Sequence, residues 1–155
     1  EINSTVQVTT HQVRLDSDNA IQLLGNSDVV IDASDNFLSR HCISAASKQL
    51  GIPHIWAAVL GYEAQMTVFY SGHGPVYEDL YPFPPKNQQS CVDAGVLGPV
   101  VAMAAAMMAT ETIKLLTGLG NPLIGTVAVY DFISGCWEYL PLEPSLSCTS
   151  KVCGD

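Results

Sequence analysis

The chain has 155 residues, the length of about one domain, and its 48% apolar and 14% charged residues are typical of a globular protein with a packed core. Its 6 basic and 15 acidic residues give a formal net charge of −9, which argues against binding to nucleic acid or to an anionic membrane. The five scattered cysteines favour a reducing compartment and no uninterrupted apolar run of transmembrane length is present, so we expect a cytoplasmic protein.

The first half of the chain predicts strands that alternate with helices. In chain order we expect a strand over Thr5–His11, a helix from Asp16 or Ser17 to Leu24, a strand over Asp28–Asp32 and a helix from about Phe37 to Leu50. The second of these strands is nearly continuous in apolar residues, which is typical of a parallel strand buried on both faces. Glycines follow both helices, at Gly25 and Gly51, and are the expected C-terminal stops.

The second half predicts two hairpins on either side of a long helix. Its expected elements are strands His54–Leu60 and Ala64–Tyr70 around Gly61, an irregular stretch over Ser71–Gln89, a helix over Val100–Leu116, and strands Thr126–Asp131 and Trp137–Leu142 around Ser134 and Gly135. Together with the first half, this order predicts an open α/β sheet with antiparallel hairpin strands. Ligands of such sheets bind outside the carboxyl ends of the parallel strands.

Polar residues follow the apolar strand Val29–Ile31 at such a carboxyl end. Asp35 and Asn36 offer oxygen ligands for a magnesium ion and hydrogen-bonding groups for a nucleotide. The alternative is that Ser34 or Asp35 only caps the following helix, because both residue types are favoured at that position. The chain contains neither a GxGxxG nor a Walker-type loop, so its own sequence offers no cradle for a phosphate chain.

Cys91 lies between the irregular stretch and the long apolar helix. A thiol in a loop just ahead of a helix is accessible, and the helix dipole favours its thiolate form. A nucleophilic cysteine is therefore expected here about as strongly as a packing cysteine. Cys42 and Cys136 fall inside predicted elements and are expected to be protected.

Other conspicuous side chains are expected to have structural roles. The four histidines show no ligand spacing and are expected at the surface or at the edge of the core: His11, His41, His54 and His73. A methionine stripe at helical spacing is flanked by alanines, which suits a packed core or a homodimer contact: Met103, Met107 and Met108. Trp56 and Trp137 are expected to anchor the core.

Four segments occur in an order that points to a known family. They are Asp28–Arg40, which contains the pattern Asp-x-x-Asp-Asn-x-x-x-Arg, then Gly61–Phe69, Cys91–Pro99 and Glu111–Gly118. This set resembles the ThiF/MoeB/HesA family, the bacterial relatives of ubiquitin-activating enzymes, over nearly the whole chain. The resemblance implies a Rossmann-like open sheet that forms the second half of the ubiquitin-activating-type fold. It also implies that the family's ATP loop, catalytic arginine and phosphate-contacting lysine lie upstream of this chain.

Family members use ATP and magnesium to adenylate the C-terminal glycine of a ubiquitin-like sulfur-carrier protein. The resemblance therefore implies an adenylyltransferase of thiamin, molybdopterin or related sulfur transfer, whose chain alone is expected to be inactive. It places Asp35 near magnesium and the triphosphate, and Asn36 and Arg40 on the nucleotide side. It also implies that Cys91 takes part in thioester or persulfide chemistry. A non-catalytic carrier-docking module or a degenerate homologue is the alternative function.

The resemblance implies further properties of the whole protein. A homodimer is expected and a sulfurtransferase is a candidate further partner, with residues 1–143 forming the C-terminal part of an adenylation domain and 144–155 a tail. Many members bind a structural zinc through two Cys-x-x-Cys pairs, but here Val76 and Asp79 stand at the positions of the first pair, and the segment Lys151–Gly154 keeps a single cysteine, Cys153. Because a tetrahedral site needs four ligands, we expect zinc to be absent.

Overall fold

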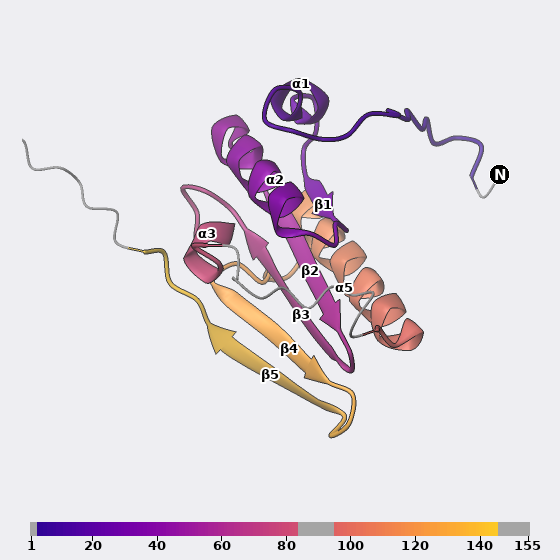
Figure 1. Cartoon of the computed structure of the whole chain (residues 1–155), viewed down its shortest axis with the longest axis vertical. Helices are drawn as coiled ribbons and strands as arrows, with labels where there is room; N and C mark the ends of the chain where they lie inside the picture. The colour runs from indigo at the N-terminus through magenta and orange to yellow at the C-terminus, as the bar shows by residue number, and fades with distance from the viewer. Residues whose placement is uncertain (1–2, 84–94, 146–155) are drawn as a thin grey trace, which may run out of the picture.

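The computed structural model describes residues 3–83 and 95–145, whose arrangement is shown in Figure 1. Its strands form one sheet in the order β1 (Val30–Asp32), β2 (His54–Leu60), β3 (Glu63–Phe69), β4 (Thr126–Asp131) and β5 (Cys136–Pro141). The described helices are α1 (Ala20–Leu24), α2 (Phe37–Leu50), α3 (Tyr77–Leu80) and α5 (Gly98–Thr117). β1 and β2 are parallel and all other neighbours are antiparallel. The predicted open α/β sheet with hairpin strands is therefore confirmed.

Helix α2 connects the two parallel strands and has well-defined ends. Asn36 caps its first turn, with its side-chain oxygen accepting a hydrogen bond from the Ser39 N–H at 2.8 Å. Gly51 ends the helix in a left-handed conformation with φ of 67°, which glycine adopts without steric cost. The carboxyl end of β1 consequently opens directly onto the first turn of α2.

Helix α5 packs against β2 and β3 through one face. Its buried residues follow helical spacing: Val100, Ala104, Met108 and Glu111. Among the described residues it is also the one helix long and apolar enough to cross a membrane by length and composition, with mean hydropathy 1.4. Glu111 and Lys114 interrupt its apolar run. Length and composition alone are weak indicators, because core helices of globular proteins pass the same test.

The two faces of the sheet carry different cores. On the side of α2 and α3, the rings of Trp56, Phe69 and Tyr77 pack with centroid separations of 5.6 to 5.9 Å. On the side of α5, the core consists of smaller and more flexible side chains: Ile55, Met66, Val68, Ala128 and Met108. Trp56 and Met108 are thus core residues as predicted, whereas Trp137 is half-buried at the edge of the α5 cluster.

Three local predictions from the sequence are wrong. Thr5–His11 forms no strand and is exposed, because no strand among the described residues pairs with its backbone. Ile31 is 49% exposed, since β1 lies at the edge of the described sheet and is not covered on both faces. Cys136 is exposed, because it begins the edge strand β5 directly after a turn.

Two other predictions need adjustment. Helix α1 begins at Ala20, later than expected, because the Asp16 carboxylate accepts hydrogen bonds from the N–H groups of Asp18 and Asn19 and so caps a turn ahead of the helix. The expected irregular stretch after β3 contains the short helix α3.

Candidate functional site

The loop between β1 and α2 is fixed at both of its ends by side chain–backbone hydrogen bonds. Asp32, the last residue of β1, is buried and accepts the Ser34 N–H at 2.9 Å. Asn36 caps α2 at the other end. Asp35 lies between these anchors and is exposed, and its carboxylate receives one weak contact, from the Asn36 amide nitrogen at 3.3 Å. The loop therefore presents a carboxylate that the fold does not use.

This geometry decides how α2 is capped. The N-cap position belongs to Asn36, so the alternative that Ser34 or Asp35 caps the helix is wrong. The cap occupies the Asn36 side-chain oxygen, which leaves Asp35 as the free oxygen ligand of the pair. Of the two residues expected to bind magnesium or nucleotide, Asp35 is the one that the local structure leaves available.

Arg40 is buried one turn into α2, with 7% of its surface exposed. Its Nε and one terminal nitrogen donate hydrogen bonds to the Ser34 carbonyl, at 3.3 and 2.9 Å. The guanidinium also lies 5.5 Å from the Phe37 ring centroid and 5.7 Å from that of Trp56. No carboxylate among the described residues forms an ion pair with it. A buried arginine without an anionic partner is uncommon, and it can bind an anionic ligand.

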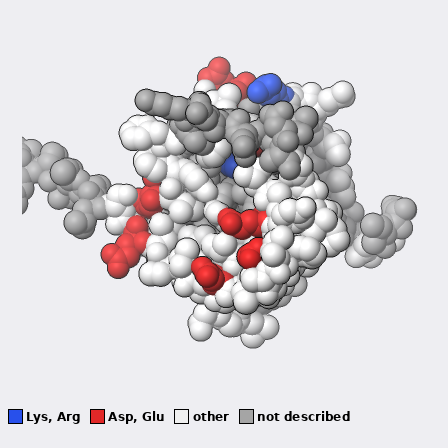
Figure 2. Space-filling model, turned by 60° about the horizontal axis from the view of Figure 1, so that its bottom comes forward, with Lys and Arg blue, Asp and Glu red and all other residues white. Residues whose placement is uncertain are grey.

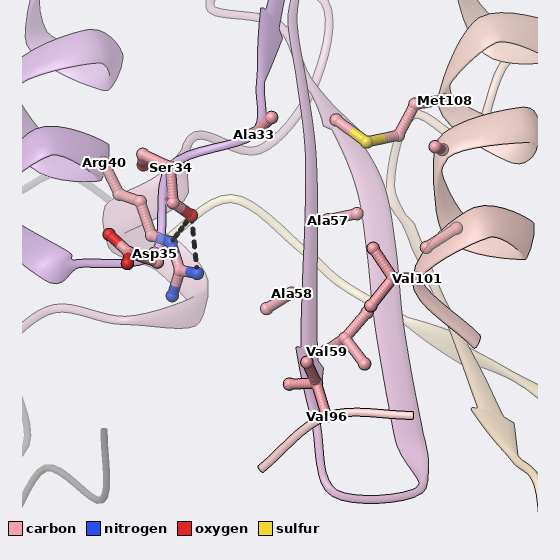
Figure 3. A pocket seen from close by; sticks show the side chains of 12 residues that line it. Ala33, Ser34, Asp35, Arg40, Ala57, Ala58, Val59, Val96, Val101 and Met108 are labelled. Carbon is pink, nitrogen blue, oxygen red and sulfur yellow. Dashed lines mark hydrogen bonds between the residues drawn. The ribbon is translucent and has the colours of Figure 1, made fainter. Parts of the chain in front are cut away.

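A cavity of about 270 Å³ joins these groups to α5. Figure 3 shows Ser34, Asp35 and Arg40 at one end, and the apolar side chains of β2, Val96 and α5 at the other. Alanines form much of its wall: Ala33, Ala57, Ala58, Ala104 and Ala105. Its volume is near the lower limit of small-molecule sites. Such a cavity suits a ligand with an anionic or metal-bound end and an apolar body.

Beneath this loop lies a buried polar pair that the sequence reasoning missed. His54 was expected at the surface or core edge, but it is 1% exposed and its Nε2 lies 3.0 Å from a carboxylate oxygen of Asp32. Burial raises the pKa of Asp32, but the hydrogen bond and charge of His54 and the hydrogen bonds from Ser34 outweigh it and lower the pKa below its ordinary value of 3.8. The sequence signal for this pair is a polar residue at the end of each of two otherwise apolar strands, Asp32 in β1 and His54 in β2.

The aromatic rings below Arg40 stay uncharged. Burial raises the pKa of Tyr77 to about 12 and also raises that of Tyr81, although the Arg40 charge opposes both shifts. Neither phenol can therefore neutralise the guanidinium near neutral pH. The charge at the polar end of the cavity is therefore set by Asp35, Arg40 and any bound ligand.

The predicted Cys91 site and part of the family's zinc-binding positions lie outside the described residues. Cys91 lies outside them, as do Cys148, Lys151 and Cys153. Within residues 3–83 and 95–145 no group of three or more His, Cys, Asp or Glu side chains could hold a metal ion. The Asp79 carboxylate instead accepts the N–H groups of Val76 and Ser145, at 2.7 and 2.8 Å. Figure 2 shows more acidic than basic side chains on the face turned to the viewer, in keeping with the net charge of −9.

Comparison with known proteins gives consistent results across most of the chain. The model described as "ThiF family" matches residues 1–150. A probable adenylyltransferase/sulfurtransferase MoeZ of Mycobacterium tuberculosis is 40% identical over 97% of this chain and 40% of its own length. A sulfur carrier protein adenylyltransferase of Thermus thermophilus is 37% identical over 99% of the chain and 59% of its own. MOCS3 of Arabidopsis thaliana, an adenylyltransferase and sulfurtransferase, is 39% identical over 99% and 33%. The chain thus spans about a third to three fifths of these relatives.

Solved structures share the fold at much lower identity. A crystal structure of E. coli MccB with MccA-N7isoASN superposes with a TM-score of 0.79 at 18% identity, covering 99% of this chain and 48% of that one. A structure of E. coli MccB with ATP gives a TM-score of 0.71 at 15% identity, covering 90% and 44%. The described sheet and helices therefore correspond to about half of that α/β fold.

Proposed function

This chain belongs to the ThiF family, and we propose that it forms part of an ATP-dependent adenylyltransferase that activates the C-terminal glycine of a ubiquitin-like sulfur-carrier protein. The relatives reported above are named as adenylyltransferases, and one is named for a sulfur carrier protein. In this proposal residues 1–143 contribute the C-terminal part of the adenylation domain, and 144–155 form a tail. The reaction serves thiamin- or molybdopterin-type sulfur transfer in the cytoplasm.

The observation that carries this proposal is the free carboxylate of Asp35 at the polar end of the cavity. Magnesium prefers oxygen ligands and is commonly held by one or two carboxylates together with substrate phosphates. The exposed Asp35 carboxylate fits that role, because the helix cap does not use it. Magnesium bound there would neutralise phosphate charge as the carrier carboxylate attacks the α-phosphorus of ATP.

Arg40 and Asn36 act on either side of this carboxylate. The Arg40 guanidinium, buried without a carboxylate partner among the described residues, would bind an anionic group of the nucleotide or of the acyl-adenylate. Asn36 holds the first turn of α2 in place and donates its amide to Asp35. Its contribution is thus to orient Asp35, with its own oxygen used for the cap.

Cys91 would act after adenylation, when its thiolate attacks the acyl carbon of the carrier adenylate, forms a thioester and releases AMP. In the alternative persulfide chemistry its thiolate would take the outer sulfur of a sulfurtransferase persulfide, whose own cysteine leaves as a thiolate. Adenylation itself needs no thiol, so Cys91→Ala should spare acyl-adenylate formation and impair only the later sulfur transfer. Brief iodoacetamide treatment with peptide mapping tests its accessibility, and Cys136 is an internal reference because it is exposed. Labelling of Cys136 without Cys91 would remove the catalytic assignment.

Partners follow from the same proposal. The carrier protein is the substrate, a sulfurtransferase consumes the activated product, and a second copy of the chain covers α5. Exposed apolar residues on α5 recur at spacings of four and three, as in a helix–helix seam: Ala102, Ala106, Ala109, Ile113 and Leu116. Sedimentation of the wild type and of Ile113→Glu measures this directly, and we expect a dimer and a monomer respectively.

We propose that no structural zinc is bound, which elemental analysis of the purified protein can check.

ATP–pyrophosphate exchange is the reaction that tests the proposed function. Exchange that depends on a carrier with a C-terminal glycine is expected from a protein in which this chain is joined to an ATP loop. The 155-residue chain by itself should show none, because its sequence contains no phosphate-cradling loop. Carrier binding without any exchange in the longer protein would support a docking module instead.

A further inference from the structure

We infer that the buried Asp32–His54 pair is a positioning device for the candidate site, holding the Ser34 backbone and thereby the direction of the Arg40 guanidinium. Three consecutive contacts connect the pair to the cavity. His54 Nε2 lies 3.0 Å from one Asp32 oxygen, the other Asp32 oxygen accepts the Ser34 N–H at 2.9 Å, and the Ser34 carbonyl accepts two hydrogen bonds from Arg40.

The position of the pair in the sheet explains why it can act on the loop. In the parallel register His54 lies opposite Val30, and Asp32 lies opposite Trp56, so the two side chains meet diagonally on the α2 face. Both side chains are almost fully buried, with 2% and 0% of their surfaces exposed. A buried carboxylate needs partners for its oxygens, and His54 and Ser34 supply them. Asp32 is thereby held in one rotamer at the end of β1.

The pair is more than a packing solution for the core. Parallel strands normally bury apolar side chains at such positions. Burying two polar groups costs stability, so their presence here points to a role other than packing. The second ring nitrogen, His54 Nδ1, has no hydrogen-bond partner among the described residues. His54 and Ser47 both line a second, smaller cavity, and the buried Ser47 hydroxyl also has no partner among the described residues. The arrangement therefore satisfies the side of His54 that faces the site loop and leaves the other side unsatisfied.

Two amide variants separate this role from a general loss of packing. Glutamine places its amide nitrogen near the position of histidine Nε2 and can still donate to Asp32, whereas asparagine is one methylene shorter and cannot reach. His54→Gln and His54→Asn are therefore a matched pair that differs only in reach. His73→Asn is the surface control, since His73 is exposed, and Val68→Ala is a core control on the opposite face of the sheet.

The first readout is independent of any enzymatic function. The chain contains two arginines, Arg14 and Arg40, so a ¹⁵N-labelled sample gives two Nε–H signals. Arg14 is exposed and forms the internal reference, while the Arg40 signal reports its hydrogen bond to the Ser34 carbonyl. We expect His54→Asn to shift this signal and to accelerate its exchange with water at least tenfold, whereas His54→Gln and Val68→Ala leave it in place. An unchanged Arg40 signal in a folded His54→Asn variant would overturn the inference.

The second readout rests on the proposed function, and it uses the complete adenylyltransferase. We expect His54→Asn to lower kcat roughly tenfold with KM for the carrier within about twofold, and His54→Gln to restore most of the rate. Val68→Ala should lower the melting temperature without this effect. A moved Arg40 signal with no exchange activity in the wild type would reject the proposed function and keep the positioning role. Equal rates for the two amide variants would reject the role of the pair in the reaction.

Discussion

The two faces of the sheet differ in how they treat buried polar atoms. Among the described residues, all six buried side-chain nitrogen or oxygen atoms without a hydrogen-bond partner lie on the α2 face: Ser34 Oγ, His41 Nε2, Ser47 Oγ, His54 Nδ1, Trp56 Nε1 and Tyr77 Oη. On the α5 face the buried carboxylate of Glu111 is instead bonded through both oxygens, to Lys114 and to the Leu123 N–H. Unsatisfied buried polar groups cost stability. The α5 face thus contributes stability without unpaired buried polar atoms, whereas the α2 face, which holds the candidate site, is destabilised by them.

The largest expected effect on stability is on the α5 face. Met66 is 1% exposed in the core formed with Met108, so Met66→Ala should lower the free energy of unfolding by about 2–5 kcal/mol. Urea denaturation followed by tryptophan fluorescence measures this. The exposed Leu60→Ala is the control and should stay near the wild type. A loss below about 1 kcal/mol for Met66→Ala would mean that this face is not the stability core.

A smaller loss is expected at the end of α5. Glu111 accepts hydrogen bonds from Lys114 at 2.6 Å and from the Leu123 N–H at 2.8 Å, and Lys114 also donates to the Asn121 carbonyl. Glu111→Ala leaves the partly buried Leu123 N–H unpaired and should cost about 1–3 kcal/mol. The exposed Glu138→Ala provides the matched control in the same denaturation experiment. Equal stabilities of the two variants would show that the loop before β4 does not depend on Glu111.

Acid should weaken the α2 face. The pKa of Asp32 and that of Glu78 are both lowered, although burial raises each of them. For Asp32 the interactions with His54 and Ser34 outweigh the burial. For Glu78 the backbone hydrogen bond and those from Lys48 and Ser44 do so. A lowered pKa in the folded state adds stability that is present above the ordinary values of 3.8 and 4.5 and disappears as pH falls through the folded values. The free energy of unfolding should therefore decline below about pH 4.5, and less steeply in Asp32→Asn. A parallel decline in both proteins would show that Asp32 does not contribute to this pH dependence.

Most of the fold could be predicted from the sequence because its signals are local. Helix α2 starts at an asparagine cap and ends at Gly51, and both hairpins have glycine in their turns, so their limits agree with the prediction to within about two residues. Thr5–His11 shows the opposite case. Its alternation is a genuine strand pattern, but a strand also needs a partner, and pairing is not encoded locally.

The site was predicted only in part, for a physical reason. Asp35 and Arg40 follow from a motif whose spacing places them on one loop and one helical turn. Which residue caps α2, and hence which carboxylate stays free, depends on backbone geometry that the sequence does not specify. The Asp32–His54 pair depends on the register between two strands that are 22 residues apart, and no local signal contains that register.

In the function that we propose, the β1–α2 loop carries the chemistry through the free carboxylate of Asp35. The most direct test is carrier-dependent ATP–pyrophosphate exchange by the complete adenylyltransferase with Asp35→Ala, beside Asp28→Ala, which removes another exposed carboxylate at the opposite end of β1. We expect exchange roughly 10²-fold slower in Asp35→Ala, with unchanged stability, and normal exchange in Asp28→Ala. Equal exchange rates in the two variants would show that the Asp35 carboxylate takes no part in the reaction.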